Sequence, residues 1–151
     1  MKNAKIETLC DARAFALGGR ATFTVVSGKT GNRFTYQVCK ARPRDGEPED
    51  APTPWFVKFL RGPDNTSDYQ YLGMVRPDGG SFTLTAASKA GEDAPVCRAW
   101  SWVWSALSGE HPERFGSIEF WHAGRCGRCN RHLTTPESLA RGLGPICAGI
   151  A

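Results

Sequence analysis

The chain has 151 residues, of which 40% are hydrophobic and 23% charged, and its formal net charge is +4. This composition excludes a disordered chain, and no apolar run approaches the ~20 residues that a membrane span needs. The charged N-terminal stretch lacks the apolar centre of a secretory signal. We therefore expect a cytoplasmic protein with no membrane association, whose six cysteines remain reduced.

Five segments read as β-strands: residues 21–27, 33–39, 55–60, 69–75 and 81–85. The first two alternate apolar and polar side chains, as half-buried strands do, and the glycines between them predict a hairpin turn. The polar, proline-rich stretch that follows them is expected to form a surface loop. The short spacings predict an antiparallel, meandering sheet.

After the strands, the apolar period changes from two residues to that of a helix. One helical stripe is formed by Val96, Trp100, Val103, Trp104 and Leu107. We expect Asp93 to cap this helix, Pro95 to occupy its first turn and Gly109 to follow its end. A short strand over residues 117–121 then leads into the C-terminal tail. The elements predict an α+β fold in which residues 1–121 form a scaffold of antiparallel sheet with one packed amphipathic helix.

The tail, residues 122–151, contains three cysteines with the spacing of a metal-binding turn. Cys126 and Cys129 are separated by two residues, and Cys147 follows after seventeen more. Structural zinc takes four tetrahedral nitrogen or sulfur ligands, so one position is left for a histidine. His122 and His132 are both near, and we favour His122 because the chain leaving the turn at His132 heads away from the metal. A disulfide is the alternative, and a reducing compartment argues against it.

A short helix is predicted between the second and third cysteines. Thr135 is placed to cap it, Pro136 to take the first helical position, and Glu137 to favour the positive end of the helix dipole. Gly142 is expected to end it. The tail is therefore predicted to be a folded zinc-binding module rather than a spacer.

Residues Arg125 to Ala148, RCGRCNRHLTTPESLARGLGPICA, resemble the signature CGRCGRxLTxPxSxxxGxGPxC. This signature belongs to a family of small, uncharacterised zinc-binding modules, a domain of unknown function frequent in bacteriophage and bacterial genomes. The resemblance implies a zinc-ribbon or treble-clef-like fold and a phage origin, which would place the protein in the cytoplasm of a bacterial host. Asn130 replaces a glycine of the signature, and both residues tolerate a left-handed backbone.

We expect a structural zinc ion and no enzyme activity. Catalytic zinc keeps a coordination position open for water, whereas three thiolates and a histidine fill the site and make a poor Lewis acid. No His-x-Glu lies at a suitable distance upstream of a Pro-Cys-x2-Cys, the pattern of the zinc deaminases. The chain also lacks a nucleophile elbow and a phosphate-binding glycine loop. The tail has too few apolar residues to fold without the metal.

The basic excess lies in the tail, which predicts a nucleic-acid contact. Residues 122–151 hold four arginines, Arg125, Arg128, Arg131 and Arg141, against one acid. Arginine pairs bidentately with phosphate and stacks on bases. Trp102, on the opposite side of its helix from the apolar stripe, either packs beneath a loop or offers a stacking surface for an unpaired base. The alternative is an inhibitor or modulator that binds a host protein, such as an enzyme or a defence complex.

Overall fold

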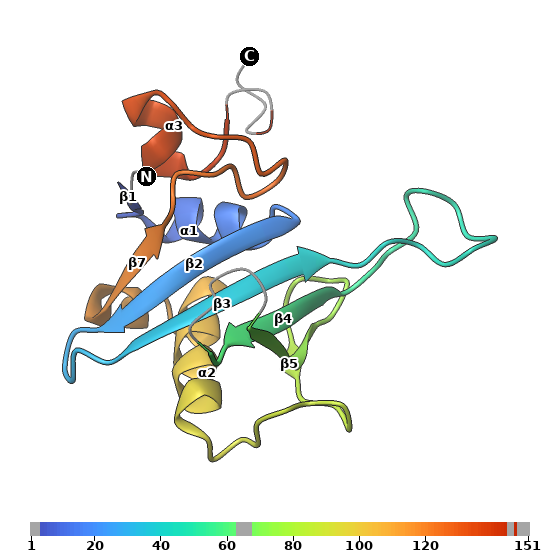
Figure 1. Ribbon diagram of the computed structural model, residues 1–151, viewed down its shortest axis with the longest axis horizontal. Coiled ribbons are helices and arrows are strands. Elements are labelled where there is room, and N and C mark those ends of the chain that lie inside the picture. The colour runs from blue at the N-terminus through green and yellow to red at the C-terminus, as the bar shows by residue number, and fades with distance from the viewer. Residues whose placement is uncertain (1–3, 63–67, 145–146, 148–151) are drawn as a thin grey trace.

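The computed structural model describes residues 4–62, 68–144 and 147. Its centre is an antiparallel sheet of seven strands in the order β1-β7-β2-β3-β4-β5-β6 (Figure 1). The strands are β1 (Ala4–Lys5), β2 (Arg20–Ser27), β3 (Arg33–Lys40), β4 (Trp55–Leu60), β5 (Tyr69–Val75), β6 (Phe82–Thr83) and β7 (Ile118–His122). The helices are α1 (Leu9–Ala16), α2 (Pro95–Leu107), the 3-10 helix η1 (Pro112–Ser117) and α3 (Pro136–Arg141). The α+β class with an antiparallel sheet is therefore confirmed.

The period of two in the strands places one set of side chains in the core. In β4, Trp55, Val57 and Phe59 are buried while Phe56 between them is exposed. The register continues this division across the sheet, since Val57 lies opposite Val38 of β3. The hairpin of β2 and β3 turns as expected, with Gly31 at φ 73°.

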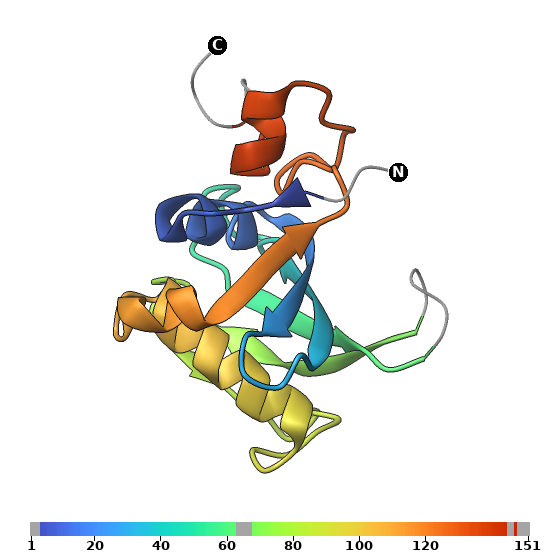
Figure 2. The same ribbon diagram turned by 90° about the vertical axis from the view of Figure 1, so that its left-hand side faces the viewer.

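Both longer helices lie on the same face of the sheet (Figure 2). The ring of Phe23 in β2 lies 6.3 Å from that of Phe15 in α1 and 6.2 Å from that of Trp100 in α2. Trp100 is fully buried and stacks on Trp104 at 5.8 Å. The Tyr36 hydroxyl donates to the carbonyl of Val96 over 2.6 Å, which fixes the start of α2 against β3.

The structure differs from the predicted elements at several points. The helix α1, the short strand β1 and the helix η1 were not predicted, so two helices and not one cover the sheet. Asp93 does not cap α2, because the N-cap is Ala94, which makes no side-chain hydrogen bond; Pro95 does occupy the first turn. The last predicted strand of the meander is reduced to two residues in β6.

Strand β7 determines where the tail begins. It lies between β1 and β2, antiparallel to both, so residues after His122 emerge beside the start of β2. There the amide of Arg20 donates to the carbonyl of Gly127 over 2.7 Å. The tail has its own small apolar cluster, with Cys126, Leu133 and Leu143 buried in it. Within the described residues, no helix is long and apolar enough to cross a membrane.

Candidate metal centre

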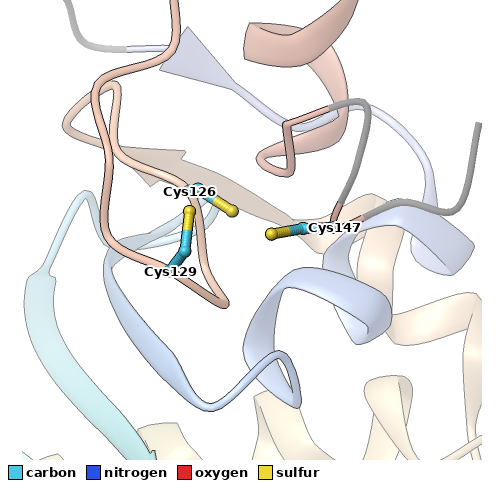
Figure 3. Close-up of side chains that lie close together, drawn as sticks. All are labelled: Cys126, Cys129 and Cys147. Carbon is cyan, nitrogen blue, oxygen red and sulfur yellow. The ribbon is translucent and has the colours of Figure 1, made fainter. Parts of the chain in front are cut away.

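Three cysteine side chains converge beyond the end of β7 (Figure 3). The sulfur atoms of Cys126, Cys129 and Cys147 all lie within 4.8 Å of one another. A tetrahedral zinc–thiolate site has Zn–S bonds of about 2.3 Å, so its sulfurs are about 3.8 Å apart. The three sulfurs therefore fit a single metal ion with little movement. All six cysteines are free thiols.

The turn that carries the first two cysteines is held by backbone hydrogen bonds. The amide of Cys126 donates to the carbonyl of Arg131 over 2.8 Å, and the amide of Asn130 donates to the carbonyl of Cys126 over 2.9 Å. Asn130 has φ 64°, the left-handed conformation that the resemblance led us to expect, and asparagine adopts it more readily than most residues. This conformation closes the turn and directs both thiols to the same side.

Gly127, between the first two cysteines, is expected from the sequence to give the turn backbone angles that other residues avoid, but its role is different. It is not among the residues with positive φ. A Cβ at this position would lie 2.6 Å from the carbonyl oxygen of Phe15 in α1, closer than such atoms approach. Glycine is required here because the turn rests directly on the backbone of α1.

The short helix α3 forms as predicted and positions the chain for Cys147. The Thr135 hydroxyl accepts a hydrogen bond from the amide of Ser138 over 3.2 Å, and Pro136 opens the helix. Gly142 ends it in the left-handed conformation at φ 76°. Leu133 before the helix and Leu143 after it are buried beside Cys126. The sequence also predicts a turn at Gly144 and Pro145 that returns the chain to the metal, and Pro145 lies outside the described residues.

Burial, backbone amides and the neighbouring sulfurs shift the pKa values of two of the thiols in opposite directions. Burial opposes ionisation of Cys126, but backbone amides of Cys129, Gly144 and Arg128 donate to its sulfur and lower its pKa to about 7. Burial and the neighbouring sulfurs of Cys126 and Cys129 raise the pKa of Cys147 to about 11. The surroundings thus make the Cys126 thiol easier to ionise and the Cys147 thiol harder to ionise. A divalent cation would take the place of the remaining thiol protons.

His122, the predicted fourth ligand, is buried at the end of β7, four residues before Cys126. Its Nδ1 accepts a hydrogen bond from the amide of Gly124 over 3.0 Å, so its Nε2 carries the proton and donates to the carbonyl of Leu139 over 2.7 Å. Among the described residues, the potential ligand atoms that lie within 4.8 Å of one another are those of the three cysteines, and neither histidine belongs to this group. His132 is exposed, on a bridge opposite Arg125. Ligation by His122 stays a prediction and requires its ring to give up one hydrogen bond.

The arginines of the tail are arranged around the turn. Arg125, Arg128 and Arg131 are exposed, and within the described part of the chain no ion pair involves them. The Arg125 guanidinium donates to the carbonyl of Asn130 over 3.1 Å. Arg141 is half-buried, and its Nε has no hydrogen-bond partner among the described atoms. Three exposed cationic side chains therefore have no acidic partner in the described part of the chain.

Trp102 is separate from this group. It lies on α2, 39% exposed, and the helices α2 and α3 are well apart in both views (Figures 1 and 2). Its Nε1 donates to the Ser117 hydroxyl over 2.9 Å, and the guanidinium of Arg114 lies 4.2 Å from the ring centroid. One ring face is therefore already covered, and the structure does not bring Trp102 together with the tail arginines.

The residues that support the centre were not predicted from sequence patterns. Phe15 lies on the unpredicted helix α1, and its ring is 5.1 Å from that of His122. The hydrogen bond from His122 to Leu139 joins residues 17 apart in sequence and depends on how α3 folds back.

The fold and the site define an α+β protein with a C-terminal group of three cysteines placed to hold a metal ion. Residues 121–150 match the sequence model of a family of unknown function (DUF6011). The match spans 30 of the 151 residues and includes all three cysteines. No curated protein and no solved structure is detectably similar to the chain.

Proposed function

We propose that the tail is a structural zinc module that binds nucleic acid through its arginines, in a non-catalytic accessory protein. The observation that carries this proposal is the group of three exposed arginines, Arg125, Arg128 and Arg131, with no acidic partner among the described residues. The single acid of the tail, Glu137, is exposed and makes no ion pair with them.

Zinc is the proposed metal because the donor set is rich in thiolate. Soft sulfur ligands select zinc over magnesium or calcium, which prefer oxygen. Even with three thiolates counted, a dication and four arginines leave the module positively charged. Its attraction to phosphate would therefore survive metal binding.

The structural role follows from the small size of the tail core. Only Cys126, Leu133 and Leu143 are buried hydrophobic residues in the described part of this cluster. Such a core cannot offset the conformational entropy of ordering the tail, so metal binding would supply the missing stability. The metal would then act by holding the arginines in fixed positions.

A charge-matched pair of variants tests the nucleic-acid contact. In the test variant Arg125, Arg128 and Arg131 become alanine; in the control, the exposed Arg42, Arg44 and Arg98 do. Affinity for labelled single-stranded and duplex oligonucleotides is measured at several salt concentrations. The test variant should bind more than tenfold more weakly, and its plot of log affinity against log salt should be shallower by about three. The control should stay close to the wild type.

Two results would overturn the proposal. Equal losses in both variants would show that only net charge matters. If the wild type binds no oligonucleotide at low salt, the alternative of a protein-binding inhibitor or modulator would be favoured, and a stoichiometric host partner in an affinity purification would support it.

A further inference from the structure

One face of the sheet carries no helix. The helices α1 and α2 lie on the buried face, and within the described residues no helix lies on the opposite one (Figures 1 and 2). We call this opposite surface the open face and define it by two cross-strand rows of outward side chains. The first row is Arg20, Cys39, Phe56 and Met74, and the second is Thr22, Gln37, Lys58 and Tyr71.

The open face presents aromatic rings that the core does not use. Phe56 is 38% exposed, one of the two large hydrophobic side chains among the described residues with such exposure. Its ring meets that of Tyr71 edge-on, with centroids 6.0 Å apart. On the same face, Trp121 of β7 lies opposite Thr24 of β2 and is partly exposed. Aromatic rings placed on an otherwise polar sheet surface are suited to stacking with flat ligands.

The charges of the open face are predominantly positive. Each row combines a ring with a cation: Arg20 shares a row with Phe56, and Lys58 lies directly opposite Tyr71. Arg33, opposite Val26 at the end of the β2–β3 hairpin, adds a third cation. Glu119 is the acid that faces them, and its carboxylate accepts a hydrogen bond from Trp121.

We propose that the open face binds single-stranded nucleic acid. Unpaired bases would stack on Phe56 and Tyr71, while Lys58 and Arg20 would neutralise the neighbouring phosphates. A duplex keeps its bases stacked on one another and cannot offer their faces to these rings, so the chemistry selects the single strand.

This face also continues towards the tail. The amide of Arg20 donates to the carbonyl of Gly127, and Arg128 is the next residue. The first row of the open face therefore ends, at Arg20, beside the backbone of the cysteine turn. The proposal itself goes beyond the zinc module, because the rings and cations of the open face belong to strands that need no metal.

Substitutions that remove the rings but keep apolar volume test the proposal. In one variant Phe56 and Tyr71 become leucine; the control is Trp102→Leu, which removes an aromatic ring of equal exposure from α2. Binding of a labelled oligothymidylate and of a duplex of the same length is titrated, and circular dichroism checks folding. The double variant should lose roughly tenfold or more in affinity for the single strand, with an unchanged salt dependence because no charge is lost. Lys58→Gln should make the plot of log affinity against log salt shallower by about one, because one phosphate contact is lost.

Several results would overturn the inference: a folded double variant that binds like the wild type, an equal loss in Trp102→Leu, equal affinity for the duplex, or no binding by the wild type. The arginine variant of the tail separates the two proposals. If the arginine variant binds the single strand normally while the double leucine variant does not, the proposed contact through the tail arginines is rejected and binding by the open face is supported. If the arginine variant loses binding while the double leucine variant does not, only the proposal for the open face is rejected.

Discussion

At the scale of single residues, His122 connects the sheet to the cysteine centre. Its ring is buried, with Nδ1 bonded to the amide of Gly124 and Nε2 to the carbonyl of Leu139. Burial lowers the pKa of this histidine, although the Leu139 carbonyl partly opposes the change. The ring is therefore neutral near pH 7, the state required either to hold these two hydrogen bonds or to ligate a metal through one nitrogen.

The fourth ligand can be identified by substituting each histidine in turn. We expect His122→Ala to lower the metal bound per chain and His132→Ala to leave it unchanged, since His132 is exposed. Because His122→Ala also removes two hydrogen bonds, the absorption spectrum of the cobalt-substituted His122→Gln protein is the second readout. Metal loss with His132→Ala, together with an unaltered cobalt spectrum in His122→Gln, would exclude His122 as a ligand.

Gly142 offers a test of the packing between the tail and α1. Its φ of 76° is unfavourable for other residues, and a Cβ there would collide with the Phe15 ring. Gly142→Ala should lower the free energy of unfolding by about 1–3 kcal/mol, measured by denaturant titration. Gly144→Ala is the control: a Cβ there meets nothing within 4 Å, so stability should change by less than about 0.5 kcal/mol. Equal effects would show that the tail does not rest on α1 in this way.

At the scale of elements, α3 brings the chain back to the centre. It has six residues, too few to be stable alone, so it depends strongly on the residues that cap its two ends. Thr135 caps its start, and the carbonyl of its Leu139 accepts from His122. The helix is thus joined to both the sheet and the cysteine turn.

Removal of this cap should weaken the tail. Thr135→Ala leaves the amide of Ser138 without its side-chain acceptor and should cost about 1 kcal/mol of stability. The adjacent Thr134 is exposed and makes no side-chain hydrogen bond within the described part, so Thr134→Ala is the matched control. Thermal unfolding of both variants checks the difference; a Thr135 variant as stable as the control would contradict the role of the cap.

Local patterns predicted the long elements and the antiparallel meander of β2 to β6, but neither the short elements nor the position of β7. The bounds of β4 and β5 match the predicted ranges because the alternation and aromatic content that predict a strand are properties of residues adjacent in sequence. The helix α1 has eight residues and β1 has two, too short for a periodic pattern to stand out. The pairing of β7 with both β1 and β2 depends on contacts about 100 residues apart, which no local pattern records.

The site shows the same division. The cysteine spacing predicted which thiols converge, because two intervening residues allow only a tight turn. The contacts of His122 and the close approach of Gly127 to Phe15 arise from the packing of the tail on α1. These contacts could not be predicted while α1 itself was missed.

At the scale of the whole molecule, two apolar clusters of very different size coexist. The main cluster lies where the helices pack on the sheet, with Trp100, Tyr36 and Phe23 at its centre. The cluster of the tail contains Cys126, Leu133 and Leu143. Only the first is large enough to persist by hydrophobic burial alone.

Chelation of the metal should therefore affect the two parts unequally. We expect amide hydrogen exchange to accelerate over residues 123–144 while the amides of β2, β3 and α2 stay protected. A chelator should also weaken the nucleic-acid contact of the arginines. Uniform acceleration across the chain, or none anywhere, would show that the metal does not stabilise the tail selectively.

One metal ion is proposed to join Cys126, Cys129 and Cys147. Elemental analysis of the purified, untagged protein, prepared under reducing conditions, can show whether it does. We expect about one zinc ion per chain and almost none in the Cys126→Ser variant. A wild-type protein without a stoichiometric transition metal, or one in which these cysteines are oxidised to each other, would contradict it.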